Sequence, residues 1–197
     1  MVLTFLKTSH FLSVFCLTAF LLPGVFLSGS SLACSNEKIF GTDLISSQAI
    51  EAKPGAMGTV VVFMSTHCPC SISHEPVLSK LAQEYKDFQF IGIHSNADEN
   101  PTLAKLHFKE AGLPFPVISD SQYRYADSFG ALKTPHAYVI GPKGECLFKG
   151  GVDSSREANS KNEAYLKNAL DSIKNGKKIL VAEARPLGCI IQRIGKK

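Results

Sequence analysis

The stretch that decides the fold runs TVVVFMSTHCPCSISHEPVLSKL from Thr59 to Leu81. Its first part, Val60 to Met64, is apolar and rich in β-branched residues, which predicts a buried strand. Apolar residues then recur at helical spacing, at Val77, Leu78, Leu81, Ala82 and Tyr85. Cys68 and Cys70 therefore lie where the strand turns into a helix. The free N–H groups and the dipole of a helix N-terminus favour a thiolate over a thiol.

An apolar segment near the N-terminus resembles a targeting signal. Lys7 supplies a positive charge, Phe11 to Leu27 is almost continuously apolar, and small residues follow from Ser28 to Ala33. We therefore expect residues 1–33 to be a signal peptide or, because the apolar run is long, an N-terminal membrane anchor. The letters SLAC also weakly resemble a bacterial lipoprotein signal, in which Cys34 would be the first mature residue.

The remaining residues, 34–197, are enough for one domain with its own core. Removing Lys7 with the signal lowers the net charge from +4 to +3, with 20 basic against 17 acidic residues, and so mild a charge argues against nucleic acid as a partner. Cys16 would leave with the signal, so the exported part carries five cysteines: Cys34, Cys68, Cys70, Cys146 and Cys189. An odd number leaves at least one thiol unpaired, lipidated or in exchange, which favours redox or metal chemistry.

The same patterns predict the other elements of the chain. We expect a hairpin or loop over 39–58, strands over 59–64, 88–94, 137–140 and 146–149, an extended piece at 117–118, helices over 71–86, 101–111, 121–129 and 157–175, and a polar tail from about 177. Asn100 is the expected cap of the second helix, and Gly112 its end. This order of strands and helices predicts a mixed sheet with helices on both faces.

Four segments of the chain resemble the thioredoxin-like superfamily and, within it, the exported redoxin or AhpC/TSA-like branch. They are the strand–CPC–helix segment, FQFIGIHSNADEN from Phe88 with GLPFPVISD from Gly112, LKTPHAYVIGPKG from Leu132, and PLGCII from Pro186. The resemblance covers about residues 38–191. It implies an α/β fold, a three-layer α/β/α sandwich with a mixed central sheet and a cis-proline loop at Thr134–Pro135.

The chain also departs from each subfamily of this superfamily. Thioredoxins have two residues between the cysteines and a tryptophan before the first, whereas here Pro69 alone separates the cysteines and His67 takes the tryptophan's place. Peroxiredoxins place a proline and a threonine or serine ahead of the reactive cysteine. Here Val61 stands at the proline position, although Ser65 could serve as the hydroxyl residue. Sco-type copper carriers use a longer cysteine spacing and a distant histidine, near whose position Lys133 falls.

Three cysteines are the candidate catalytic residues. Cys68 is the expected nucleophile, because it occupies the first-cysteine position at the helix start. Cys70 is the first candidate for the resolving thiol, since a Cys-X-Cys disulfide closes a small ring and should be reduced readily. Cys189 is the rival partner and would meet Cys68 if the tail folds back over the helix start.

Thr134, Pro135 and His67 are the candidate substrate-binding residues. A cis proline turns the backbone so that its neighbour can pair with an extended substrate. We expect His67 to tune the thiolate, Cys146 to be a core residue, and His74, one helical turn after Cys70, to be exposed.

The resulting hypothesis is an exported thiol–disulfide oxidoreductase that acts in the periplasm or another extracytoplasmic compartment, with a possible tether to the membrane through its N-terminus. Its partners would be protein thiols or disulfides, or a redox partner protein. No organic cofactor is expected, because the chain has no glycine-rich phosphate loop.

Two alternatives stay open. One is a Cu(I)-binding, Sco-like metallochaperone in which Cys68, Cys70, His74 and Cys189 bind a soft metal. The other is a peroxiredoxin-type thiol peroxidase, against which the missing proline counts.

Overall fold

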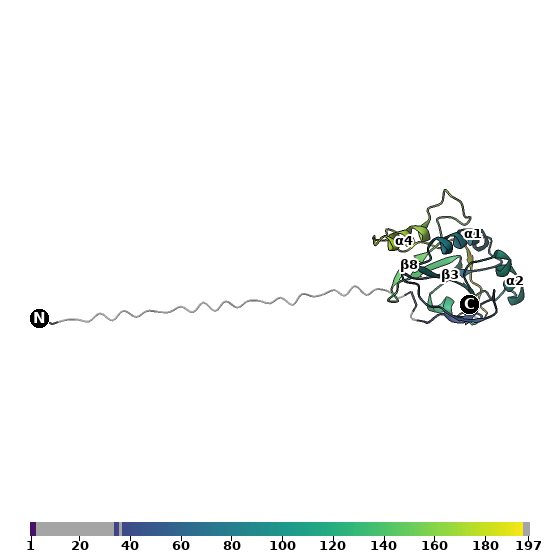
Figure 1. Cartoon of the computed structure of the whole chain (residues 1–197), viewed down its shortest axis with the longest axis horizontal. Helices are drawn as coiled ribbons and strands as arrows, with labels where there is room; N and C mark the ends of the chain where they lie inside the picture. Colours follow the sequence, from purple (N-terminus) through teal and green to yellow (C-terminus); the bar gives the residue numbers. More distant parts are fainter. Residues whose placement is uncertain (3–33, 36, 195–197) are drawn as a thin grey trace. The chain divides into compact units, whose positions relative to one another are not determined.

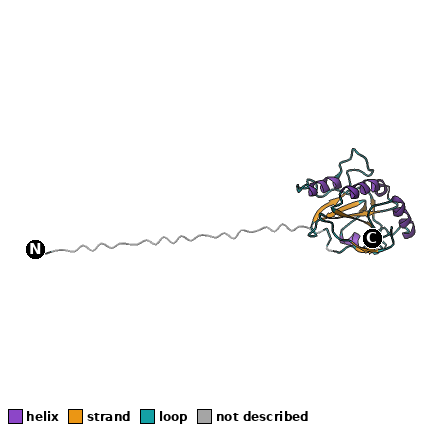
Figure 2. Cartoon of the chain, in the orientation of Figure 1, coloured by secondary structure: helices purple, strands orange, loops and turns teal. Residues whose placement is uncertain are grey.

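A computed structural model describes residues 1–2, 34–35 and 37–194 of the chain (Figures 1 and 2). The predicted signal peptide or anchor, residues 1–33, lies outside the described residues except for its first two. Within the described part, no helix is both long and apolar enough to span a membrane.

A five-stranded mixed sheet forms the centre of the fold, in the order β5-β4-β3-β7-β8. Its strands are β3 (Gly58–Met64), β4 (Phe88–His94), β5 (Val117–Ser119), β7 (His136–Ile140) and β8 (Cys146–Gly150). β3, β4 and β5 run parallel, whereas β7 is antiparallel to both β3 and β8. Two short ladders accompany the sheet: β1 (Phe40–Thr42) with β2 (Ala49–Glu51), and β6 (Lys133–Thr134) with β9 (Cys189–Ile190).

Strand β3 is buried along its whole length, because helices and loops cover both faces of the sheet. Val60, Val62 and Met64 face a core that also takes buried residues of α1 (Pro69–Glu84), α2 (Pro101–Ala111) and α4 (Tyr165–Lys174). Val61 and Phe63 point the other way, into a core shared with α3 (Arg124–Ser128). In Figure 1, α1 and α4 lie over the same side of β3 and β8. The predicted three-layer α/β/α sandwich with a mixed sheet is confirmed.

Most predicted elements are present, and the helices predicted over 121–129 and 157–175 differ most from their predicted bounds. β4 and α2 have the expected ends, and Asn100 caps α2 by accepting the N–H groups of Thr102 and Leu103. The predicted helix over 157–175 begins only at Tyr165. The predicted helix over 121–129 is also shorter, because Tyr123 adopts a left-handed conformation with φ of 60° just before Arg124.

A loop occupies residues 154–164, where the sequence predicts helix. Asp153 organises it, because one carboxylate oxygen accepts the N–H of Ser155 at 2.8 Å and the other accepts the side-chain amide of Asn162 at 2.8 Å. The N–H of Ala158 donates to the Ser73 hydroxyl of α1 at 2.7 Å. These local hydrogen bonds offer the backbone an alternative to a helix. The apolar periodicity of the sequence therefore starts before the helix itself does.

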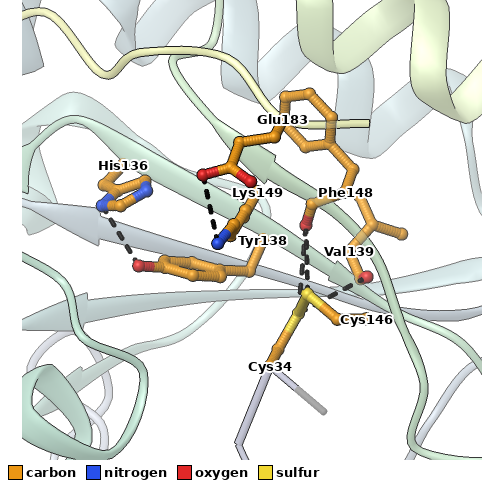
Figure 3. Close-up of a disulfide and its surroundings, with 8 residues drawn as sticks. All are labelled: Cys34, His136, Tyr138, Val139, Cys146, Phe148, Lys149 and Glu183. Atoms are coloured by element: carbon orange, nitrogen blue, oxygen red, sulfur yellow. Dashed lines mark hydrogen bonds and ion pairs between the residues drawn. A yellow bond between two sulfur atoms is a disulfide. The ribbon is translucent and has the colours of Figure 1, made fainter. Parts of the chain in front are cut away.

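A disulfide joins Cys34 to Cys146, the first residue of β8 (Figure 3). Cys146 packs against the second core, as expected, but its disulfide was not predicted. The bond also uses the sulfur of Cys34 that a lipid would need, so the structure offers the lipoprotein alternative no support. Because the two cysteines lie 112 positions apart in the sequence, the cross-link restricts the unfolded chain strongly.

Candidate active site

Cys68 is the N-cap residue of α1 and follows the short turn, residues 65–67, that connects β3 to this helix. Pro69 begins the helix, two residues earlier than predicted, because its fixed φ suits the first helical position. The N–H of Cys68 donates to the Ser65 hydroxyl at 3.0 Å. The side chain is buried, with an exposed fraction of 1%. Its Sγ lies 3.1 Å from the carbonyl oxygen of Thr134, which accepts the hydrogen of the protonated thiol.

The peptide bond between Thr134 and Pro135 is cis, as predicted. It brings the Thr134 carbonyl against Cys68 and leaves the backbone of β6 open to a partner strand. That partner is the C-terminal tail of the same chain, because Thr134 pairs with Cys189 and Lys133 pairs with Ile190 in antiparallel register.

The tail folds back over the start of α1 and delivers Cys189 to Cys68. The N–H of Cys189 donates to the Cys68 Sγ at 3.4 Å. Gly188 permits this approach, because a Cβ at that position would lie 1.9 Å from the Thr134 carbonyl oxygen. The Sγ atoms of Cys68, Cys70 and Cys189 all lie within 4.8 Å of one another, so the structure brings the three predicted cysteines together.

The two neighbouring histidines are placed differently from each other. His67 is exposed, and its backbone N–H donates to the Ser65 hydroxyl at 3.2 Å. His74 is completely buried, so the expectation of an exposed side chain is wrong. Its Nδ1 lies 2.7 Å from the Cys70 carbonyl oxygen and its Nε2 lies 3.1 Å from the Asp153 carboxylate. Both ring nitrogens therefore face groups other than the sulfurs, and His74 drops out of the possible metal-binding set.

A buried carboxylate supports the loop before Cys68, and the sequence prediction missed it. Glu99 accepts hydrogen bonds from the hydroxyls of Ser65 and Thr66, from the N–H of Thr66 at 2.7 Å, and contacts His94 Nε2 at 2.9 Å. Because Ser65 donates its hydrogen to Glu99, its oxygen lone pairs are free to accept the N–H of Cys68. Glu99 follows β4 in a polar run, where nothing in the sequence marks it as buried.

The AhpC/TSA family matches residues 42–147, more than half of the chain. The chain belongs to the AhpC/TSA family. It is also 28% identical over 125 residues to the thiol–disulfide oxidoreductase ResA of Halalkalibacterium halodurans, a match that covers 62% of this chain and 71% of that protein.

Solved structures share the fold of this AhpC/TSA chain. An uncharacterized conserved protein from Geobacillus kaustophilus superposes with a TM-score of 0.76 at 25% identity, covering 84% of this chain and 94% of its own. A secreted Mycobacterium tuberculosis disulfide oxidoreductase homologous to E. coli DsbE superposes with a TM-score of 0.56 at 18% identity, covering 68% of this chain and 95% of its own. The predicted thioredoxin-like redoxin branch and the predicted thiol–disulfide oxidoreductase class are confirmed.

The three thiols of this AhpC/TSA domain differ in acidity. Burial raises the pKa of Cys68, but hydrogen bonds from the Cys189 thiol and from the N–H groups of Ser71 and Cys189 outweigh it, so the net pKa is lowered. Burial and the interaction with Cys68 raise the pKa of Cys189 to about 12. Burial and the charge of Cys68 likewise raise the pKa of Cys70. The arrangement therefore favours a thiolate at Cys68 with two protonated thiols beside it.

The hydrogen bond from the Cys189 thiol can be tested by substitution. Cys189→Ala in a Cys70→Ser background removes one donor to the Cys68 thiolate, so we expect the pKa of Cys68 to rise by about one to two pH units, followed by thiolate absorbance near 240 nm. Cys189→Ser keeps a hydroxyl donor and serves as the matched control, for which we expect a smaller rise. An unchanged or lower pKa in Cys189→Ala would contradict the proposed hydrogen bond.

The buried carboxylate predicts a specific dependence of stability on pH. Burial raises the pKa of Glu99, but hydrogen bonds from His94, Ser65 and Thr66 outweigh it and hold the pKa at about 2. The pKa of Glu99 in the folded protein lies below the ordinary value of 4.5. The ionised carboxylate therefore adds to the free energy of unfolding, fully above about pH 4.5, and this stabilisation is lost as the pH falls towards 2. The loss is on the order of 3 kcal/mol.

Glu99→Gln should therefore unfold at lower urea concentration at pH 7 and lose part of the wild-type acid sensitivity between pH 4.5 and 2. Glu110→Gln alters an exposed carboxylate of α2 and serves as the control. The assignment is wrong if Glu99→Gln and wild type show the same change of unfolding free energy across that range.

Proposed function

We propose that this chain is an exported thiol–disulfide oxidoreductase in which Cys68 is the nucleophile and Cys189 is the resolving thiol. The observation that carries the proposal is the contact between Cys68 and Cys189, in which the N–H of Cys189 lies 3.4 Å from the Cys68 Sγ and the pKa of Cys68 is lowered. A thiolate is the reactive form of cysteine, and it needs a second thiol within reach to complete exchange.

The proposed reaction moves two electrons from the protein to a disulfide. The Cys68 thiolate attacks one sulfur of the substrate disulfide, forms a mixed disulfide and releases the other sulfur as a thiolate. That thiolate takes up the proton of Cys189, and the Cys189 sulfur then attacks Cys68. A Cys68–Cys189 disulfide forms as the Cys68 bond to the substrate breaks, and the second substrate sulfur leaves as a thiolate. A dithiol partner protein reverses these steps to restore the reduced form.

Thr134, Pro135 and His67 are the proposed substrate-binding residues. The backbone of Thr134 is next to the cis peptide bond and can pair with an extended strand once β9 is displaced, and its carbonyl lies 3.1 Å from the Cys68 Sγ. His67 is exposed beside the cysteines, where its ring is accessible to a substrate.

Cys189 is favoured over Cys70 as the resolving thiol. Cys70 lies in the first turn of α1, and a Cys68–Cys70 bond would close a ring through Pro69, whose φ is fixed. The carbonyl of Cys70 is also held by His74 at 2.7 Å. Cys189 approaches from a separate strand, so a bond to it requires no distortion of the helix start.

Export is supported by two observations besides the predicted signal. The Cys34–Cys146 disulfide is of a kind that persists in oxidising compartments. The disulfide oxidoreductase from M. tuberculosis with the same fold is described as secreted. A periplasmic or other extracytoplasmic location and a tether through residues 1–33 are therefore part of this proposal.

The cysteine roles are tested by a set of three serine variants. In reduction of glutathione disulfide coupled to dithiothreitol, Cys68→Ser should abolish turnover. Cys189→Ser should reduce turnover at least ~10-fold and accumulate a mixed disulfide on Cys68, detected by mass spectrometry. Cys70→Ser is the matched control and should keep most of the activity. Activity that survives in Cys68→Ser would refute the assignment, whereas loss confined to Cys70→Ser would make Cys70 the resolving thiol.

Copper transport is a second candidate, because three thiols converge within 4.8 Å and thiolates are preferred ligands of Cu(I). In this case Cu(I) is cargo bound by Cys68, Cys70 and Cys189, without His74.

Competition of the reduced protein with a Cu(I) chelator tests the copper candidate. We expect one tightly bound Cu(I) per chain, lost in Cys68→Ser and Cys70→Ser and retained in the control His74→Asn. Failure to withdraw Cu(I) from the chelator would eliminate this function.

The peroxidase alternative is not proposed. A peroxidatic site would use the Ser65 hydroxyl toward the Cys68 sulfur, but this hydroxyl donates to Glu99 and accepts the N–H of Cys68 instead.

A further inference from the structure

The C-terminal segment from Gly188 to Arg193, here termed the closing segment, occupies the edge that the proposed substrate would use. Its strand β9 pairs with Lys133 and Thr134 of β6, directly before the cis proline. A backbone edge can pair with one strand at a time on the same side. The closing segment and an extended substrate therefore compete for Thr134.

Contacts on both sides of Cys189 hold the closing segment in place. Ile191 is buried, with an exposed fraction of 2%, and its N–H donates to the Leu132 carbonyl at 3.0 Å. Arg193 donates to the carbonyl of Ala131 at 2.7 Å, beyond Ile191. These contacts continue past the end of β9, so displacing the closing segment has a free-energy cost.

The preceding residues of the tail are attached to β8. The N–H of Ala184 donates to the Lys149 carbonyl at 3.0 Å, and the N–H of Lys149 donates to the Ala182 carbonyl at 3.0 Å. Figure 3 shows the carboxylate of Glu183 directed at the ammonium of Lys149, at 3.1 Å. The tail therefore enters the site from a fixed position, which directs Gly188 and Cys189 onto Thr134.

The closing segment covers the nucleophile. Cys68 is 1% exposed, whereas Cys189 is exposed and Ile190 is 64% exposed on the outer side of the segment. We expect a disulfide of low molecular mass to need only a rotation of the Cys189 side chain to reach Cys68. An extended polypeptide must displace the whole of β9 before it can pair with Thr134.

We infer that the closing segment determines substrate class and makes the site selective for low-molecular-mass disulfides over disulfides in extended polypeptides. The inference rests on the proposed function, because it concerns the same Cys68 and the same Thr134 edge. Gly188 is the specificity-determining residue, since only glycine allows β9 to lie against the Thr134 carbonyl.

Gly188→Ala tests the inference without removing any contact of the core. The added Cβ would lie 1.9 Å from the Thr134 carbonyl oxygen, so β9 must move away. Arg193→Ala loosens the far end of the segment without a clash, and Ile190→Ala is the matched control because its side chain is largely exposed.

The first measurement is the rate at which iodoacetamide alkylates Cys68 in a Cys70→Ser/Cys189→Ser background. We expect Gly188→Ala to raise this rate at least ~10-fold, Arg193→Ala to raise it about twofold to threefold, and Ile190→Ala to leave it unchanged. Equal rates in Gly188→Ala, Arg193→Ala and their parent would overturn the inference.

The second measurement compares kcat/KM for glutathione disulfide with kcat/KM for a disulfide within an extended peptide, with all cysteines present. Gly188→Ala should shift the ratio toward the peptide at least ~10-fold, and an unshifted ratio would contradict the inference. The alkylation rate does not depend on turnover, so failure of the proposed function, seen as activity in Cys68→Ser, is distinguishable from failure of this inference.

Discussion

The burial of β3 between two cores is the constraint on which the rest of the structure depends. Because both faces of this central strand are covered, its last residue has a fixed position at the carboxyl end of the parallel strands. The chain leaves the sheet there, turns through Ser65 to His67, and enters α1 at Pro69. Cys68 is thereby held at a helix N-terminus beside the cis-proline loop, with its sulfur directed at Thr134. The position of the nucleophile follows from apolar packing of the strand before it.

The chemistry of Cys68 depends on a balance between burial and hydrogen bonding. A sulfur with an exposed fraction of 1% should resist ionisation, and the lowered pKa requires donors that compensate for the lost water. The donors come from the first turn of α1 and from the tail, which are far apart in the sequence. The tail therefore both covers the thiolate and stabilises it.

Local patterns in the sequence predict most of the fold. Strand β4 and helix α2 have the bounds that the apolar pattern and the capping residues predict, because these signals lie within or next to each element. The start of α4 is not predictable in this way, because side-chain hydrogen bonds of Asp153 decide it. The site is also predictable only in part. The motif around Cys68 and the tail motif around Cys189 indicate reactive thiols from the sequence alone. Composition and spacing do not encode contacts between distant segments. The Cys34–Cys146 bond, the burial of His74 beside Asp153 and the contact of Glu99 with Ser65 all depend on such contacts.

The short ladder between β6 and β9 also affects how the protein behaves among copies of itself. Unpaired N–H and C=O groups at a sheet edge are a template on which another chain can add a strand. In this fold the backbone of Lys133 and Thr134 is already satisfied by the chain's own C-terminus. The protein thus keeps a reactive sulfur next to a cis proline without presenting that edge as a nucleus for self-association.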